Sequence, residues 1–111
     1  MYYTVVLWTP KLAWLDLSPE ERGTYVGSIG PAMQKHAAMG IDITVMATND
    51  ADTDHRAPYS YFSIVQSPDE AAAKAFEADV RAAGWYDYFD QVNVRGVARS
   101  AEEVIGEHIG M

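Results

Sequence analysis

The chain of 111 residues contains no cysteine. Disulfides, thiolate nucleophiles and thiolate metal sites are therefore excluded. Basic residues are also few, because 8 Lys and Arg stand against 16 Asp and Glu and leave a net charge of −8. A surface of this charge repels phosphate backbones and anionic lipid, so we expect neither nucleic acid nor a membrane as a partner.

Long apolar runs are absent as well. No segment approaches the roughly 20 apolar residues that a membrane-spanning helix needs. The stretch Met1–Trp8 has neither the basic residues nor the small-residue cleavage site of a secretory signal peptide. We therefore expect a cytoplasmic protein. With 49% hydrophobic and 22% charged residues, the chain has the composition of one globular domain, residues 1–111.

Strand and helix patterns alternate along the chain. Four segments have the β-branched, aromatic or alternating character of strands, namely 2–8, 41–48, 59–66 and a stretch beginning near 92. Helix start signals lie at Ser18 and Ser67, where each serine is followed by Pro and acidic residues, and apolar stripes at helical spacing follow. Pro31 is expected to kink the first helix. A third start signal at Ser100 predicts a short C-terminal helix.

The order βαββαβ predicts an α+β domain. It has a four-stranded antiparallel sheet, two main helices on one face and a short C-terminal helix. In the second strand we expect Val45 and Met46 on opposite faces, with Ile43 beside Val45. The first strand is apolar on both sides, with Val6 on one side and Val5 on the other. A sheet that is apolar on both faces needs another layer, which a two-fold homodimer packed sheet to sheet supplies.

This architecture and the aromatic stretch Ala83–Phe89 resemble the dimeric α+β barrel superfamily of ferredoxin-like proteins, over nearly the whole chain. That stretch and the loop Asp50–Tyr59 look like those of small bacterial members related to antibiotic-biosynthesis-type monooxygenases and polyketide cyclases. The superfamily also includes quinol monooxygenases, haem-degrading monooxygenases and lactone isomerases. Its haem-degrading members carry an axial His on the second helix. The corresponding segment, Asp69–Ala83, contains no His, so the expected cofactors are none.

The polar loop 49–59 concentrates ionisable groups. His55 is a candidate general acid or base, and its neighbour Asp54 is the carboxylate that would orient it. The alternative is a solvated loop whose charges pair with one another. Three aspartates at alternate positions resemble the start of an EF-hand loop, but the required Gly and the final acidic residue are missing. The expected metal sites are therefore none.

His36 is a rival candidate for the catalytic base. It lies three residues after Met33, at the edge of the apolar stripe of the first helix. From there it would point between helix and sheet. The alternative is a structural histidine that is hydrogen-bonded within the core.

Aromatic side chains indicate a pocket for a flat apolar ligand. The candidate substrate-binding residues are Trp8, Tyr61, Trp85, Tyr86, Tyr88, Phe89 and Arg95. Core packing or a dimer interface would use the same aromatic residues. The leading hypothesis is a cofactor-free enzyme that acts by proton transfer on an aromatic or polycyclic metabolite, as a cyclase, isomerase or monooxygenase. The alternative is a non-catalytic ligand-binding or stress-related module.

Overall fold

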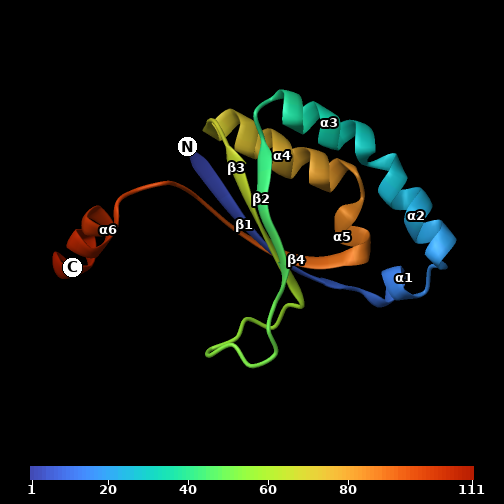
Figure 1. Cartoon of the computed structure of the whole chain (residues 1–111), viewed down its shortest axis with the longest axis horizontal. Coiled ribbons are helices and arrows are strands. Elements are labelled where there is room, and N and C mark those ends of the chain that lie inside the picture. The colour runs from blue at the N-terminus through green and yellow to red at the C-terminus, as the bar shows by residue number, and fades with distance from the viewer.

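The computed structural model describes all residues, 1–111. Its elements follow in the order β1 (Tyr2–Pro10), α1 (Leu12–Leu15), α2 (Pro19–Ser28), α3 (Gly30–Ala38), β2 (Asp42–Thr48), β3 (Tyr61–Ser67), α4 (Glu70–Ala82), α5 (Trp85–Tyr88), β4 (Phe89–Val97) and α6 (Ala101–Ile109) (Figure 1). None of these helices combines the length and the apolar character that crossing a membrane requires.

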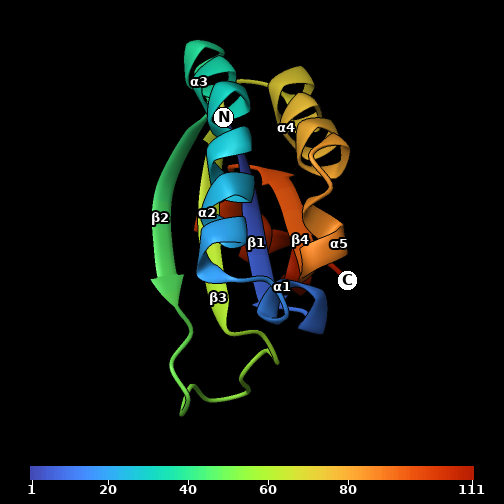
Figure 2. The same ribbon diagram turned by 90° about the vertical axis from the view of Figure 1, so that its right-hand side faces the viewer.

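The four strands form one antiparallel sheet in the order β2-β3-β1-β4. Helices α2, α3 and α4 lie together on one side of it (Figure 2). The α+β architecture that the sequence predicts, with its four-stranded antiparallel sheet, is therefore confirmed. β1 is a central strand because its alternating residues Thr4 and Val6 are buried beneath the helices, next to Val65 and Ser63 of β3.

The middle of the sheet face that the helices leave open is apolar, with Asp42 and Asp90 on the same face beyond it. Two rows cross all four strands, one of Val92, Leu7, Phe62 and Ala47 and the other of Val94, Val5, Ile64 and Val45. None of these eight side chains is buried, and none carries a charge. We call these eight residues the open face.

Val45 and Met46 of β2 lie on opposite faces, as predicted, but the prediction that Ile43 lies beside Val45 is wrong. A bulge between Ile43 and Val45 shifts the register, so that Ile43 pairs with Val65 and Met46 with Ser63. Ile43 and Met46 therefore lie on the helix-covered face, while Val45 lies on the open face. A bulge adds one residue to one strand, so the residues after it lie on the opposite face from the one that strict alternation predicts.

The start of the first helix agrees with the sequence. Ser18 Oγ accepts the backbone N–H of Glu21 at 3.1 Å, and the Glu21 carboxylate accepts the N–H of Ser18 at 2.9 Å. The predicted kink is also present, because the helix divides at Ile29 into α2 and α3, directly before the Gly30–Pro31 pair.

The start of α4 differs from the prediction. Asp69 caps this helix, with its carboxylate accepting the N–H of Ala72 at 2.8 Å. Ser67, the predicted cap, is the last residue of β3 and is buried, and its hydroxyl has no hydrogen-bond partner. Pairing of Ser67 with Tyr2 extends the strand by one residue beyond the predicted end.

Two other boundaries also differ. The connector after β1 contains the short helix α1, and β4 begins at Phe89 because its first residues pair with Pro10 and Thr9 of β1. Within the aromatic stretch, Trp85–Tyr88 form the single helical turn α5, and Phe89 is the first residue of β4. Gly84 precedes α5 with a φ of +74°, a left-handed conformation that glycine adopts without strain.

Candidate functional site

A cavity of about 160 Å³ lies between α3, α4 and the helix-covered face of the sheet. Met33 and His36 reach it from α3, and Phe76 and Asp79 reach it from α4. In each pair the two residues are three apart, so they project from one face of their helix. Twelve of the 16 lining residues are hydrophobic, and the polar ones are few enough to define an orientation for a ligand.

His36 and Asp79 form the polar centre of this cavity. The His36 Nε2 and the Asp79 Oδ2 are 2.8 Å apart, and the His36 side chain is only 9% exposed. Phe76 contacts the imidazole edge-on, with 5.3 Å between the ring centroids. The imidazole is therefore fixed by a hydrogen bond on one side and by an aromatic ring on another.

The tautomer of His36 follows from this hydrogen bond. An ionised carboxylate can only accept, so Nε2 carries the proton and Nδ1 of the neutral ring carries the lone pair. Nδ1 has no hydrogen-bond partner in the protein. The side-chain atoms that lack a partner and are also shut off from solvent are Thr4 Oγ1 and Ser67 Oγ, and Nδ1 is not among them. The lone pair of Nδ1 is thus accessible, and it belongs to a ring that lines the cavity.

Asp79 is held in its ionised form. Its hydrogen bond from His36 is the main cause that lowers the pKa of this carboxyl below its ordinary value, and a second bond from Lys35 acts in the same direction. The Lys35 Nζ lies 3.3 Å from the same Oδ2 atom. Because the carboxylate stays charged, it stabilises a positive charge on the His36 imidazole whenever the ring takes up a proton.

Ser63 and Gln91 add hydrogen-bonding groups to the cavity wall. Ser63 is buried in β3, and its hydroxyl has no protein partner but is not shut off from solvent, so it is free toward the cavity. Gln91 Oε1 accepts the indole N–H of Trp85 at 2.7 Å, and Gln91 Nε2 donates to Asn93 at 3.0 Å. Gln91 is thus held in place.

Of the predicted substrate-binding residues, Trp8 and Trp85 line the cavity. Tyr61 lies behind Trp8 and stacks on it, with 5.8 Å between the ring centroids. The other four do not line the cavity. Tyr86 lies under the guanidinium of Arg81, Tyr88 packs on Trp14, and Arg95 forms an ion pair of 2.9 Å with Glu77. Phe89 packs on Trp14 and also stacks on the cavity-lining Trp85, with 3.9 Å between the ring centroids.

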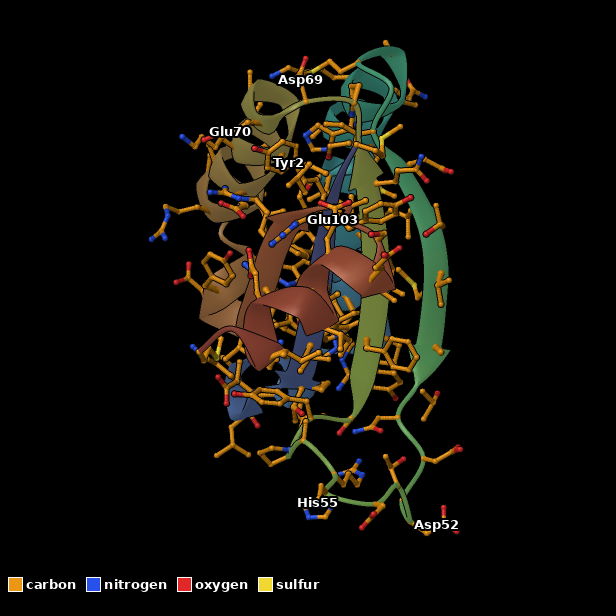
Figure 3. All side chains as sticks on the ribbon, turned by 90° about the vertical axis from the view of Figure 1, so that its left-hand side faces the viewer. Tyr2, Asp52, His55, Asp69, Glu70 and Glu103 are labelled. Atoms are coloured by element: carbon orange, nitrogen blue, oxygen red, sulfur yellow. The ribbon has the colours of Figure 1, made fainter.

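The loop histidine is placed far from this cavity. His55 and Asp54 do pair, with 3.1 Å between Nδ1 and Oδ1, but both side chains are more than 90% exposed. Figure 3 shows His55 and Asp52 at the end of the loop, beyond the sheet and on the side away from Asp69 and the start of α4. Asn49 and Arg56 hold the loop through hydrogen bonds to its own backbone. The structure therefore brings His36, and not His55, to the cavity.

Three polar residues that line the cavity were not predicted from the sequence, namely Asp79, Ser63 and Gln91. Asp79 had a usable signal, because it lies three residues after Phe76 and so on the buried face of α4, where an acidic residue needs a partner. Ser63 and Gln91 had none, since polar residues in strands usually face water.

Comparison with known proteins gives a family. The match to the model of the Family of unknown function (DUF6616) covers residues 1–111. The chain belongs to this family. A search of curated proteins found no match.

Solved structures give the fold. A mutant chlorite dismutase from Candidatus Nitrospira defluvii superposes with a TM-score of 0.70 at 16% identity, covering 95% of this chain and 43% of that one. HapK from Hahella chejuensis superposes with a TM-score of 0.48 at 14% identity, covering 91% and 95%. The chain thus spans less than half of the dismutase chain. The likeness to the dismutase shows a ferredoxin-like α+β fold, in agreement with the resemblance seen in the sequence.

No three His, Asp or Glu side chains cluster so as to hold a metal ion. The residues present also do not fit a haem. The cavity, at about 160 Å³, has the volume of a single ring and not of a macrocycle, and α4 offers it Phe76 and Asp79 but no histidine.

Proposed function

We propose that this protein is an enzyme that binds a small single-ring metabolite in the cavity and moves a proton on it, with His36 as the base. The observation that carries the proposal is the pairing of His36 and Asp79 at an apolar cavity, with Nδ1 of the imidazole unpartnered and accessible. A histidine with a carboxylate behind it is a recurrent arrangement in general acid–base catalysis.

The size of the cavity limits the ligand. An apolar cavity of about 150 Å³ accommodates benzene, and the cavity here measures about 160 Å³. We therefore propose one ring rather than the polycyclic ligand that the sequence also allowed. The exposed side chains of Met33 and Met46, on α3 and on the edge strand β2, flank the entrance.

The proposed step is removal of an acidic proton from the ligand, either an O–H or a C–H next to a carbonyl. The proton passes to Nδ1 of His36, and Asp79 stabilises the resulting imidazolium. The electron pair left on the ligand spreads onto its oxygen, where the Ser63 hydroxyl donates a hydrogen bond. Return of the proton to another carbon completes an isomerisation. Cyclisation and attack on oxygen begin with the same step.

We also propose that the protein works as a homodimer. The open face presents two uncharged rows to water, and a second copy related by a two-fold axis covers both faces in one contact. Because the cavity lies on the opposite side of each sheet, each subunit keeps its own site.

Exchange of the α-hydrogens of cyclohexanone in D₂O tests the proposal. This probe has one ring and a carbonyl, and its deuteration is followed by proton NMR. We expect His36→Gln to lower the catalysed exchange rate by about 100-fold or more, the usual contribution of a general base. His55→Gln is the matched control and should retain the wild-type rate. Ser63→Ala should raise KM and lower kcat without affecting the fold. Equal rates in wild type and His36→Gln would dismiss the mechanism.

A non-catalytic binding module is the second candidate. It is favoured by one observation, namely that His36 and Lys35 both bond to Asp79 and so tie α3 to α4. In that case wild-type protein would show thermal stabilisation by cyclohexanone without catalysed exchange, and circular dichroism would report a loss of stability in His36→Gln.

A further inference from the structure

The C-terminal helix α6 stands apart from the rest of the chain. It follows β4 after the short connection 98–100 and lies on the same side of the sheet as the open face (Figure 1, Figure 3). Every hydrogen bond and ion pair of residues 101–111 is made within residues 99–111. The principal extents are 53 × 36 × 19 Å, and the radius of gyration of 16.1 Å exceeds the roughly 13 Å of a compact domain of this length.

α6 is nevertheless a well-formed helix with an apolar side. Ser100 and Glu103 form a reciprocal capping box, and Arg99 bonds to the Glu107 carboxylate at 2.7 Å. Ile105 and Ile109 are 55% and 81% exposed. Since a helix of nine residues is marginal by itself in water, packing of this apolar side is needed to stabilise it.

We propose that α6 clasps a second copy of this chain. The inference rests on the proposed dimer: a partner docked on the open face lies on the side where α6 stands, and a two-fold axis lets each chain both give and receive a helix. In this arrangement Ile105 and Ile109 of each chain pack against the other subunit. The apolar helix and the apolar open face, both without a partner in one chain, are covered by the same contact.

The area that a stable dimer needs supports this occupant. Four strands at about 4.8 Å spacing and about 3.3 Å per residue give the sheet face roughly 500 Å². A standard interface buries about 800 Å² per partner. A nine-residue helix that packs on the partner buries on the order of 150 Å² of its own surface, and the partner's helix buries a similar area on this chain. The open face together with the exchanged helices therefore reaches the usual size, and the open face by itself does not. A net charge of −8 disfavours anionic lipid as the alternative occupant.

Sedimentation equilibrium of an Ile105→Glu/Ile109→Glu double variant tests the clasp. Both positions are exposed within one chain, so circular dichroism should show an unchanged fold, while the dimer Kd should rise roughly 100-fold or more because apolar contacts are lost twice by symmetry. Ala101→Glu adds a negative charge to the exposed start of the same helix and is expected to leave the Kd unchanged.

Isotope mixing shows which subunit α6 touches. The chain has no cysteine, so a nitroxide on Met111→Cys, just beyond α6 and outside the proposed contact, is a unique label. When this unlabelled-isotope variant is mixed with ¹⁵N-labelled wild type, any broadened amide signals arise between subunits. We expect broadened amide signals in this mixture, together with the higher dimer Kd of the Ile105→Glu/Ile109→Glu variant. If the double variant dimerises with the wild-type Kd and no amide signals are broadened, the clasp is overturned but the dimer is not. A wild type that stays monomeric would overturn both, and neither result touches the proposed proton transfer.

Discussion

His36 owes its position to contacts from a distant part of the chain. The carboxylate of Asp79, 43 residues away, accepts a hydrogen bond from Nε2–H, and Phe76 of the same helix α4 lies against the ring. A free imidazole changes charge near neutral pH, so its surroundings decide what it can do. Here the surroundings leave one nitrogen available and place a carboxylate behind the other, which is the arrangement that a base requires.

Replacing Asp79 with Asn keeps an acceptor for Nε2–H but removes the charge. The imidazolium then loses its stabilising partner, so the catalysed exchange of cyclohexanone should fall by an order of magnitude or more. Exchange rates of both proteins at pH 7 measure this. An unchanged rate would mean that Asp79 has only a structural role.

The same variant makes a prediction about stability. The pKa of Asp79 is lowered in the folded protein, mainly by the His36 hydrogen bond, so the carboxylate stabilises the fold at pH values above its ordinary range near 4 and loses this effect as the pH falls through the lowered pKa. Urea denaturation should therefore show Asp79→Asn about 1 kcal/mol less stable at pH 7. The difference should shrink as the pH falls below the ordinary pKa of an aspartate. A difference that grows in acid would contradict the assignment.

At this scale the sequence predicted part of the site. His36 could be recognised from its place beside Met33 on the helical stripe, and Trp8 and Trp85 from their aromatic character. The other aromatic residues could not be separated, because core packing uses the same side chains. The position of Asp79 on the buried face of α4 could have been recognised, but its pairing with His36 and the place of Ser63 depend on which elements pack together. A single sequence contains no direct record of that packing.

Among the elements, α4 gives a matched pair of variants at its start. Asp69 caps the helix, so Asp69→Ala should lower the free energy of unfolding by about 1 kcal/mol. Ser67 is buried with an unpartnered hydroxyl, so Ser67→Ala should be neutral or stabilising. Thermal denaturation of both variants distinguishes this structure from the prediction made from the sequence. If Ser67 were the cap, Ser67→Ala would be the destabilising substitution and Asp69→Ala the neutral one.

Two glycines make a second matched pair. Gly84 has a φ of +74°, and a Cβ there would also lie 3.4 Å from the Asp87 carboxylate. Gly84→Ala should therefore destabilise the protein by about 1 kcal/mol. Gly27 lies in α2 with open space around it, so Gly27→Ala should stabilise by about 0.5 kcal/mol. Equal effects of the two substitutions in chemical denaturation would be inconsistent with the left-handed turn before α5.

Element types were easier to predict than their faces. Capping signals and alternation are local, and they identified the four strands and the three longer helical regions. The bulge in β2 is not local, since it arises where Ile43 and Val45 meet β3 in shifted register. The bulge changes the faces of Val45 and Met46 relative to Ile43. As a result, Met46 reaches the cavity and Val45 reaches the open face.

For the whole molecule, the uncharged open face is the feature that the fold by itself leaves unexplained. Val94 is 66% exposed there, so Val94→Glu should be harmless in a monomer and should raise the dimer Kd roughly 100-fold. Leu12, 75% exposed on the short helix α1, offers a control of similar exposure, and Leu12→Glu should dimerise normally. Light scattering during size exclusion reads out both. If the two variants dimerise alike, another surface must form the contact.

The central claim is that His36 meets the ligand inside the cavity. NMR of the histidine ring nuclei during titration with phenol tests it most directly, with toluene as the probe of the same size that lacks an acidic proton. We predict that phenol shifts the His36 signals to saturation while those of His55 stay fixed, and that His36→Gln weakens binding of phenol but not of toluene. Phenol and toluene binding equally to both proteins, with the His36 signals unmoved, would contradict the account.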